Sequence, residues 1–292
     1  TKGFENISKA AGQVDMGSLG NGVESVKLKF SALEVMAVTA LSNITNKAID
    51  TGAQLVKSLT VDQIAEGWDK FKSKTSSVAT LVAQGYDLSE VNEQLNRLNW
   101  FTDETSYNFT EMTSNIAKFT ATGKGLTESV SAMEGIANWA ALSGQNAETA
   151  SRAMYQLSQA MGAGVMRKED YKSIQNASMD TEEFRQKCLD AGVALGTLKQ
   201  NADGTYKSLV ANVKDGNFTI SQFAEHLTQD AWLTSDVMMQ VFGDYSSAVD
   251  QIYEYAEEKG ITASQAIEEL GDSVDAFGLK AFKAAQEARS WS

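Results

Sequence analysis

The sequence predicts a mainly α-helical fold, in which long amphipathic helices precede a compact multi-helix domain with a small β-hairpin patch. Proline, which breaks helix interiors, is absent from all 292 residues, whereas average usage would give roughly 15. Apolar residues recur at alternating steps of three and four. Several Thr, Asp and Asn residues stand three positions before Glu or Gln, as at helix N-termini.

Two segments near the N-terminus carry a continuous apolar seam. Its spacing averages 3.5 residues, which keeps one helix face turned toward a partner helix, as in coiled coils. The two helices could pack on each other as a hairpin or on other copies of the chain. The first segment holds Val23, Val26, Phe30, Leu33, Ala37, Ala40 and Ile44, and the second holds Val61, Ile64, Trp68, Phe71, Thr75, Val78 and Val82.

The most apolar stretch of the chain is residues 30–44, in which Glu34 is the only charged residue. A helix needs about 20 apolar residues to span a bilayer. This run is shorter, follows Lys29 and has the polar Asn43 near its end. We therefore expect a buried or partner-facing helix without a membrane role.

Helix boundaries are well marked from residue 85 onward. The pairs Asp87 with Glu90, Asn108 with Glu111, Asp180 with Glu183, and Thr262 with Gln265 predict helix starts. Glycines that follow apolar runs predict helix ends in a left-handed conformation; they are Gly85, Gly123, Gly144, Gly192 and Gly260.

Two adjacent apolar stripes predict a helix pair joined by the turn at residues 143–146. Met and Ala at this spacing are typical of a core surface rather than a cofactor site. The first stripe is Leu126, Val130, Met133, Ala137 and Ala140, and the second is Ala150, Met154, Leu157 and Met161.

Residues 198–220 break the helical pattern. Turn signals at residues 201–204 and 214–217 flank the β-forming segments 205–210 and 218–220, which predicts a small hairpin or three-strand patch. We divide the chain into an extended helical arm, residues 1–60, and a helical domain, residues 61–292. Neither end of the sequence has a natural boundary, so we expect a piece of a longer protein.

Charge and cysteine content limit the function classes. The formal net charge is −13, and no cluster of Lys and Arg is present, which argues against direct nucleic-acid binding and against an anionic membrane surface. Cys188 is the only cysteine, so no internal disulfide can form, and we expect it to be a small buried side chain.

Three segments of the sequence partly resemble catalytic or ligand-binding motifs, but none has all the residues that its motif requires. His226 is the only histidine and is expected to be an ordinary helical residue, which leaves no zinc site and no histidine-based triad. A calcium loop around Asp203-Gly204 would need carboxylate side chains at positions 199 and 210, where this chain has Lys199 and Val210. The Gly123-Lys124-Gly125 segment lacks the phosphate-loop spacing. We predict no catalytic residue, no metal site and no cofactor.

Several ordered segments resemble the phage and prophage tail tape measure proteins of Gram-positive hosts. These segments are residues 27–41, 95–112, 136–144 and 153–161, followed by the Gly162-Ala163-Gly164 turn and residues 168–171. The likeness extends from about Phe4 to Trp291. The chain departs from the family pattern at residues 177–180, where many relatives have a glycine-containing turn, which leaves the geometry of that turn open.

The resemblance implies a structural protein of the tail that is not an enzyme. Such a protein helps to set tail length during assembly, scaffolds polymerisation of the tail tube, and takes part in genome delivery. Implied partners are other tape measure copies, the tail tube protein and tail assembly chaperones, in the host cytoplasm during assembly and then in the tail lumen of the virion. The alternative is a helical surface or secreted protein-interaction module of a bacterium.

Overall fold

The computed structural model describes residues 74, 77–78, 80–121, 123–210 and 216–288. The chain divides into two units, Thr1–Thr75 and Ser76–Ser292, and the fold below is that of the second. The predicted division at residue 60 stays a prediction. The described elements are α5 (Leu88–Glu104), α6 (Phe109–Thr120), α7 (Leu126–Leu142), α8 (Ala147–Gly162), α9 (Lys168–Asn176), α10 (Glu182–Ala194), β1 (Leu198–Gln200), β2 (Tyr206–Ser208), β3 (Asn217–Phe218), η1 (Ile220–His226), α11 (Leu227–Asp230), α12 (Ser235–Lys259), α13 (Ala263–Leu270), η2 (Gly271–Ser273) and α14 (Ala276–Ala288).

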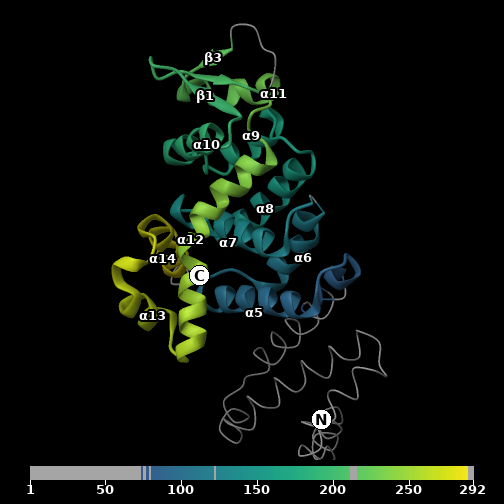
Figure 1. The fold of residues 1–292 in the computed structure, drawn as a ribbon, viewed down its shortest axis with the longest axis vertical. Coiled ribbons are helices and arrows are strands. Elements are labelled where there is room, and N and C mark those ends of the chain that lie inside the picture. The colour runs from purple at the N-terminus through teal and green to yellow at the C-terminus, as the bar shows by residue number, and fades with distance from the viewer. Residues whose placement is uncertain (1–73, 75–76, 79, 122, 211–215, 289–292) are drawn as a thin grey trace, which may run out of the picture. The chain divides into compact units, whose positions relative to one another are not determined.

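These elements confirm the predicted fold class, mainly α with a small β patch. Helix α7 is the centre of the unit, and α5, α6, α8, α12 and α14 all pack against it (Figure 1). The sheet lies at one end of the unit and α13 at the other. The predicted stripe on α7 is buried, and so is every residue from Ala132 to Ala141, because neighbouring helices cover the whole circumference of α7.

Three of the four predicted helix starts are confirmed. Asp87 accepts a hydrogen bond from the Ser89 amide, Asn108 accepts from the Thr110 and Glu111 amides, and Thr262 forms a capping box with Gln265. These side chains satisfy amides that have no partner inside the helix.

The fourth predicted start, at Asp180, is wrong by one residue. Thr181 caps α10 and accepts from the Phe184 amide, while Asp180 accepts from the Tyr171 hydroxyl and from Gln175. Asp180 therefore forms hydrogen bonds with side chains of α9 and does not cap α10. The turn between these two helices, which departs from the family pattern, places Ser178 at φ +54°, in the left-handed region that glycine favours.

The predicted helix ends at Gly85, Gly123, Gly144 and Gly260 are confirmed by positive φ angles. Gly192 is a wrong prediction, since it lies inside α10. A Cβ atom there would lie 2.9 Å from Leu198 Cδ1 and 3.2 Å from Trp232 Cε3. Gly192 is needed for close packing, and Gly196, at φ +73°, takes the left-handed position after the helix.

The predicted β patch is a three-stranded antiparallel sheet in the order β1-β2-β3. The turn after β1 is closed by the Asn201 amide, which donates to the Thr205 carbonyl at 2.8 Å. Side chains alternate across the sheet, as strand geometry requires. Leu198, Tyr206, Ser208 and Phe218 are buried on the inner face, while Lys199, Lys207 and Asn217 are exposed on the outer face.

Candidate functional site

The predicted helix-packing seam lies mostly outside the described residues. Val78 is buried and Val82 is half-buried. Val23, Val26, Phe30, Leu33, Ala37, Val61, Ile64, Trp68 and Phe71 are not among the described residues. The seam as a whole therefore stays a prediction. The candidate site that the structure describes lies in the interior of the second unit.

Cys188 lies on α10 and is fully buried as a free thiol. Burial raises the pKa of this thiol well above its usual value, and the nearby Asp180 carboxylate acts in the same direction. The thiolate is the nucleophilic form of cysteine, so a buried thiol with a raised pKa is unreactive. Cys188 is therefore a packing residue, as the sequence predicts.

His226 contacts both the sheet and the short helix that follows it. Its Nδ1 lies 2.7 Å from Oδ2 of Asp230, a residue that is only 1% exposed. The His226 ring stacks on Phe218 of β3 at a centroid distance of 4.7 Å, and Ser208 donates to the Asp230 carbonyl at 2.7 Å. These contacts give His226 a structural role.

In the part of the chain that the structure describes, no three His, Cys, Asp or Glu side chains are grouped so as to hold a metal ion. No helix there has both the length and the apolar character needed to cross a membrane.

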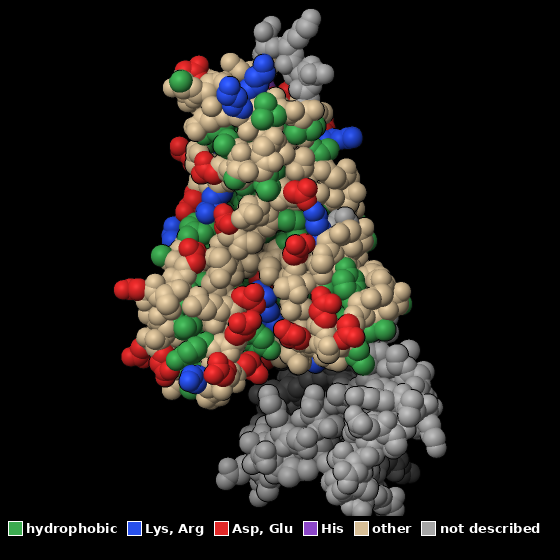
Figure 2. Space-filling model, viewed as in Figure 1, with side chains coloured by type: hydrophobic (Ala, Val, Ile, Leu, Met, Phe, Trp, Pro, Cys, Tyr) green, Lys and Arg blue, Asp and Glu red, His purple; other side chains and the backbone are tan. Residues whose placement is uncertain are grey.

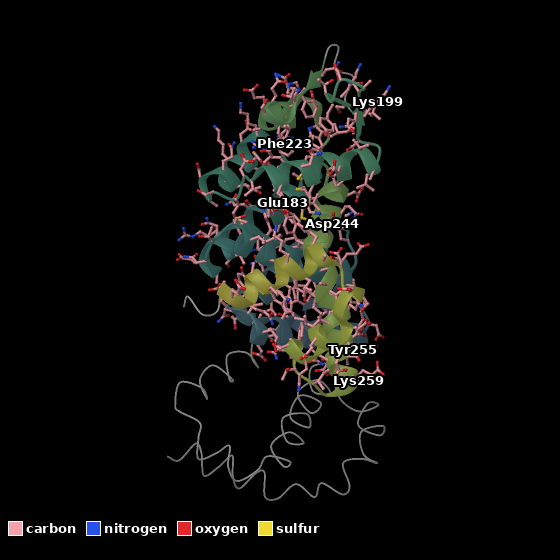
Figure 3. All side chains as sticks on the ribbon, turned by 90° about the vertical axis from the view of Figure 1, so that its left-hand side faces the viewer. Glu183, Lys199, Phe223, Asp244, Tyr255 and Lys259 are labelled. Carbon is pink, nitrogen blue, oxygen red and sulfur yellow. The ribbon has the colours of Figure 1, made fainter. Side chains whose placement is uncertain are left out.

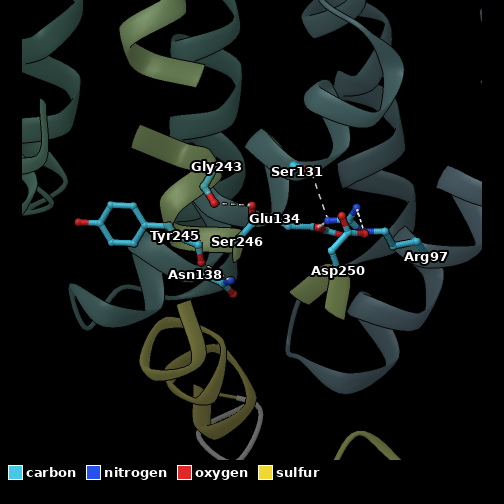
Figure 4. Close-up of polar contacts among 8 residues, drawn as sticks. All are labelled: Arg97, Ser131, Glu134, Asn138, Gly243, Tyr245, Ser246 and Asp250. Atoms are coloured by element: carbon cyan, nitrogen blue, oxygen red, sulfur yellow. Dashed lines mark hydrogen bonds and ion pairs between the residues drawn. The ribbon is translucent and has the colours of Figure 1, made fainter. Parts of the chain in front are cut away.

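The most unusual polar group in the interior is a charge cluster in which Arg97 and Glu134 are buried and Asp250 is partly exposed (Figure 4). The three side chains come from α5, α7 and α12. Arg97 donates from Nε and Nη2 to the two carboxylate oxygens of Glu134, and from Nη1 to Asp250 at 2.5 Å. Arg97 is 2% exposed and Glu134 is 0% exposed. The cluster thus joins three helices that are distant in sequence.

The two-point contact between Arg97 and Glu134 is the geometry that favours a charged guanidinium and a charged carboxylate. Burial nevertheless raises the pKa of Glu134, and the charge of Arg97 and its hydrogen bonds offset this only in part. Burial opposes the Arg97 charge, but the carboxylates of Glu134 and Asp250 outweigh burial and raise the pKa of Arg97. A buried pair of this kind need not add stability over an apolar pair of similar volume. It does make the arrangement specific, because removing one partner leaves the other charge buried.

The backbones of α7 and α12 come unusually close together beside this cluster. A Cβ atom on Gly135 would lie 1.9 Å from the Phe242 carbonyl oxygen and 2.7 Å from its carbonyl carbon. Only glycine fits such an approach. One turn further along α7, Asn138 donates to the Tyr245 carbonyl at 2.9 Å (Figure 4). Residues 135 and 138 therefore form one face of α7 that fits α12.

An aromatic cluster continues this interface toward the sheet end. Trp139 stacks on Phe184 of α10 with ring centroids 4.0 Å apart, and both rings contact Phe242 of α12. Aromatic pairs of this geometry stabilise a core beyond their buried area. Through this cluster, α7, α10 and α12 share one continuous hydrophobic core.

The α7–α12 interface, together with the charge cluster and aromatic cluster beside it, is a helix-packing site. It holds together helices from both ends of the unit. The three charged side chains and Nδ2 of Asn138 are hydrogen-bonded, whereas Oδ1 of Asn138 and Nε1 of Trp139 are buried without a hydrogen-bond partner among the described residues. Sequence reasoning did not identify Arg97, Glu134 or Asp250. The available signal was Glu134, which is the only charged residue between Ser129 and Leu142 of α7.

Comparison with protein-family models gives one finding. The model described as tape measure protein matches residues 60–281. Searches of curated proteins and of solved structures found no match.

Proposed function

Since the chain belongs to the tape measure protein family, whose members are structural proteins of phage tails, we propose that it helps to set tail length during assembly. We further propose that it scaffolds polymerisation of the tail tube and takes part in genome delivery. The observation that carries this proposal is the family match, which extends over residues 60–281.

The packing of the unit supports a structural role. Its polar interior groups, including the charge cluster and Asn138, are used to hold helices together. Its net charge also suits a tail component that does not bind the genome. Residues 76–292 hold 30 of the 38 acidic residues and 16 of the 25 basic ones, a net charge of −14. Such a surface repels phosphates and does not retain DNA.

We propose three kinds of partner: other copies of the chain, the tail tube protein and tail assembly chaperones. The protein would meet the chaperones in the host cytoplasm and would then lie in the lumen of the virion tail. The apolar seam predicted for residues 23–44 supports this, because large apolar surfaces on soluble proteins mark interaction sites.

Site-specific crosslinking in purified phage particles tests this placement. We expect a photo-crosslinking amino acid at Tyr155, whose side chain is 43% exposed, to join the chain to the tail tube protein or to a second copy in mature tails. A matched insertion at the buried Phe119 should give only crosslinks within the chain. Absence of the chain from purified particles, with recovery on the bacterial surface or in the medium, would favour the alternative interaction module.

A further inference from the structure

The three-stranded sheet and the short helices η1 and α11 form a cap on one end of the unit. We define the cap as the described residues 197–210 and 216–230, and the body as the rest of the second unit. The cap packs on α9 and α10 of the body. Figure 3 shows Lys199 of β1 and Phe223 of η1 toward the end of the unit opposite Tyr255.

Contacts within the cap join all of its elements. The antiparallel ladders connect β1, β2 and β3. Ser208 of β2 donates to the Asp230 carbonyl of α11 at 2.7 Å. His226 of η1 stacks on Phe218 of β3, and its Nδ1 lies 2.7 Å from Oδ2 of Asp230. These contacts hold the cap together without the help of α9 or α10.

The two faces of the cap differ in polarity. On the outer face, Lys199 and Lys207 are exposed, and Lys and Arg side chains stand at this end of the unit in Figure 2. On the inner face, Leu198, Phe218 and Phe223 are buried. The outer face can therefore stay in water whether or not the inner face is covered.

Aromatic rings hold the inner face of the cap against the body. Phe223 packs on Tyr171 of α9 with ring centroids 5.2 Å apart. Phe218 and Phe223 both contact Trp232, at centroid distances of 5.9 and 5.2 Å. Tyr171 and Trp232 are 0% exposed. Hydrogen bonds also cross this boundary; they include Gln186 Nε2 to the Tyr206 hydroxyl at 3.2 Å and the Lys168 amide to the Thr228 hydroxyl at 3.0 Å.

The backbone is left-handed at both ends of the cap. Gly196, directly after α10 and its last turn, has φ +73°, and Ala231 has φ +49°. Beyond Ala231 the chain is fixed to the body again, because the Met166 amide donates to the Leu233 carbonyl at 2.9 Å. Hinges are residues at the ends of elements that absorb a change in backbone angles. Gly196 and Ala231 have this position.

The closed position is costly at the second of these residues. Alanine is disfavoured in the left-handed region, because its Cβ crowds the following carbonyl oxygen. On either side of Ala231, Oδ1 of Asp230 and Nε1 of Trp232 are buried without a hydrogen-bond partner among the described residues. Buried polar atoms of this kind cost free energy. Opening at Ala231 would relieve the backbone and let water reach both atoms.

We propose that the cap is a hinged lid, which opens at Gly196 and Ala231 while the helices of the body stay folded. Opening uncovers the apolar surface of Tyr171 and Trp232, which the closed cap keeps out of water. The body has contacts of its own that the cap does not share, namely the charge cluster and the close approach at Gly135. Contiguous segments of a protein can open in this way below the free energy of global unfolding.

Hydrogen exchange followed by mass spectrometry on the complete 292-residue chain tests the proposal. The amides of β1, β2 and η1 should share one opening equilibrium and should exchange faster than the buried amides of α7 and α12. Low concentrations of urea should accelerate exchange in the cap less than in α7, because opening of the cap exposes less surface than unfolding of the unit.

Ile116→Val is the decisive variant. Ile116 lies on α6 of the body and is 1% exposed. The change weakens the closed and the open form equally, so exchange in α7 and α12 should become about fivefold faster, while exchange in the cap stays unchanged. Phe223→Ala weakens only the closed form and should accelerate exchange in the cap by about a hundredfold.

Three results would overturn the proposal. The first is an equal acceleration of the cap and α7 in Ile116→Val, because the cap would then open only when the whole unit unfolds. The second is cap exchange as slow as that of α7 in the unchanged chain. The third is unrelated opening equilibria for β1 and η1, because the cap would then not move as one group. The Ile116→Val comparison decides the matter even if Phe223→Ala does not fold.

Discussion

Substitution of Gly135 by alanine is expected to lower the free energy of unfolding by about 3 kcal/mol, the upper part of the range for overpacked interiors. The added methyl group would lie 1.9 Å from the Phe242 carbonyl oxygen. That oxygen belongs to the backbone of α12, so no side-chain rotation can relieve the clash. Helices α7 and α12 would have to move apart, and the Asn138 hydrogen bond and the charge cluster cross the same interface.

Gly243→Ala is the matched control for this change. Gly243 lies on α12 one residue after Phe242, and a Cβ atom there would meet nothing within 4 Å. Alanine stabilises a helix interior over glycine by about 0.5–1 kcal/mol, so this variant should be slightly more stable. Urea unfolding followed by circular dichroism measures both. Equal stability of Gly135→Ala and the wild type would show that the two helices do not approach as described.

Replacement of Glu134 by alanine is expected to cost about 3 kcal/mol, the lower part of the range for breaking a buried pair. The change leaves the buried Arg97 guanidinium with an ion pair to Asp250, whose side chain is 51% exposed, and a hydrogen bond to the neutral Ser131 hydroxyl. It also removes two hydrogen bonds to a charged group. We place the loss at the lower end because Asp250 still neutralises part of the charge.

A double variant separates the charge effect from the packing effect. Arg97→Met with Glu134→Leu removes both buried charges and keeps apolar volume, so it should lose less stability than Glu134→Ala. Glu148→Ala breaks the exposed pair with Arg152 and should change stability little, because exposed pairs contribute little. The same urea unfolding applies. A Glu134→Ala variant as stable as Glu148→Ala would contradict the buried charge cluster.

Local features of the fold could be predicted from the sequence because they depend on neighbouring residues. The caps at Asp87, Asn108 and Thr262 and the turn at residues 201–204 use side chains within a few positions of the amides they bind. The errors at Asp180 and Gly192 have a different origin. Asp180 accepts from Tyr171, nine residues earlier, and Gly192 packs against Trp232. Tertiary contacts override the local pattern at both positions.

The packing site could not be predicted, because its partners are far apart in the chain. Arg97 is 37 residues from Glu134 and 153 residues from Asp250. A single buried arginine, or a glutamate among apolar residues, indicates that a partner exists but does not identify it. The close approach at Gly135 depends likewise on how α12 crosses α7. The family, by contrast, could be recognised from ordered segments along the chain, and the match over residues 60–281 confirms it.

Tail length in a phage whose tape measure gene carries a tandem duplication of residues 76–292 is the most direct test of the proposed function. Electron microscopy of purified particles gives the length distribution of the tails. If the duplicated 217 residues contribute to a length-setting molecule, the tails lengthen by a uniform increment, with an upper bound of about 330 Å if they run as one helix at about 1.5 Å per residue. Tails of unchanged length that contain the duplicated chain would contradict a role of these residues in setting tail length.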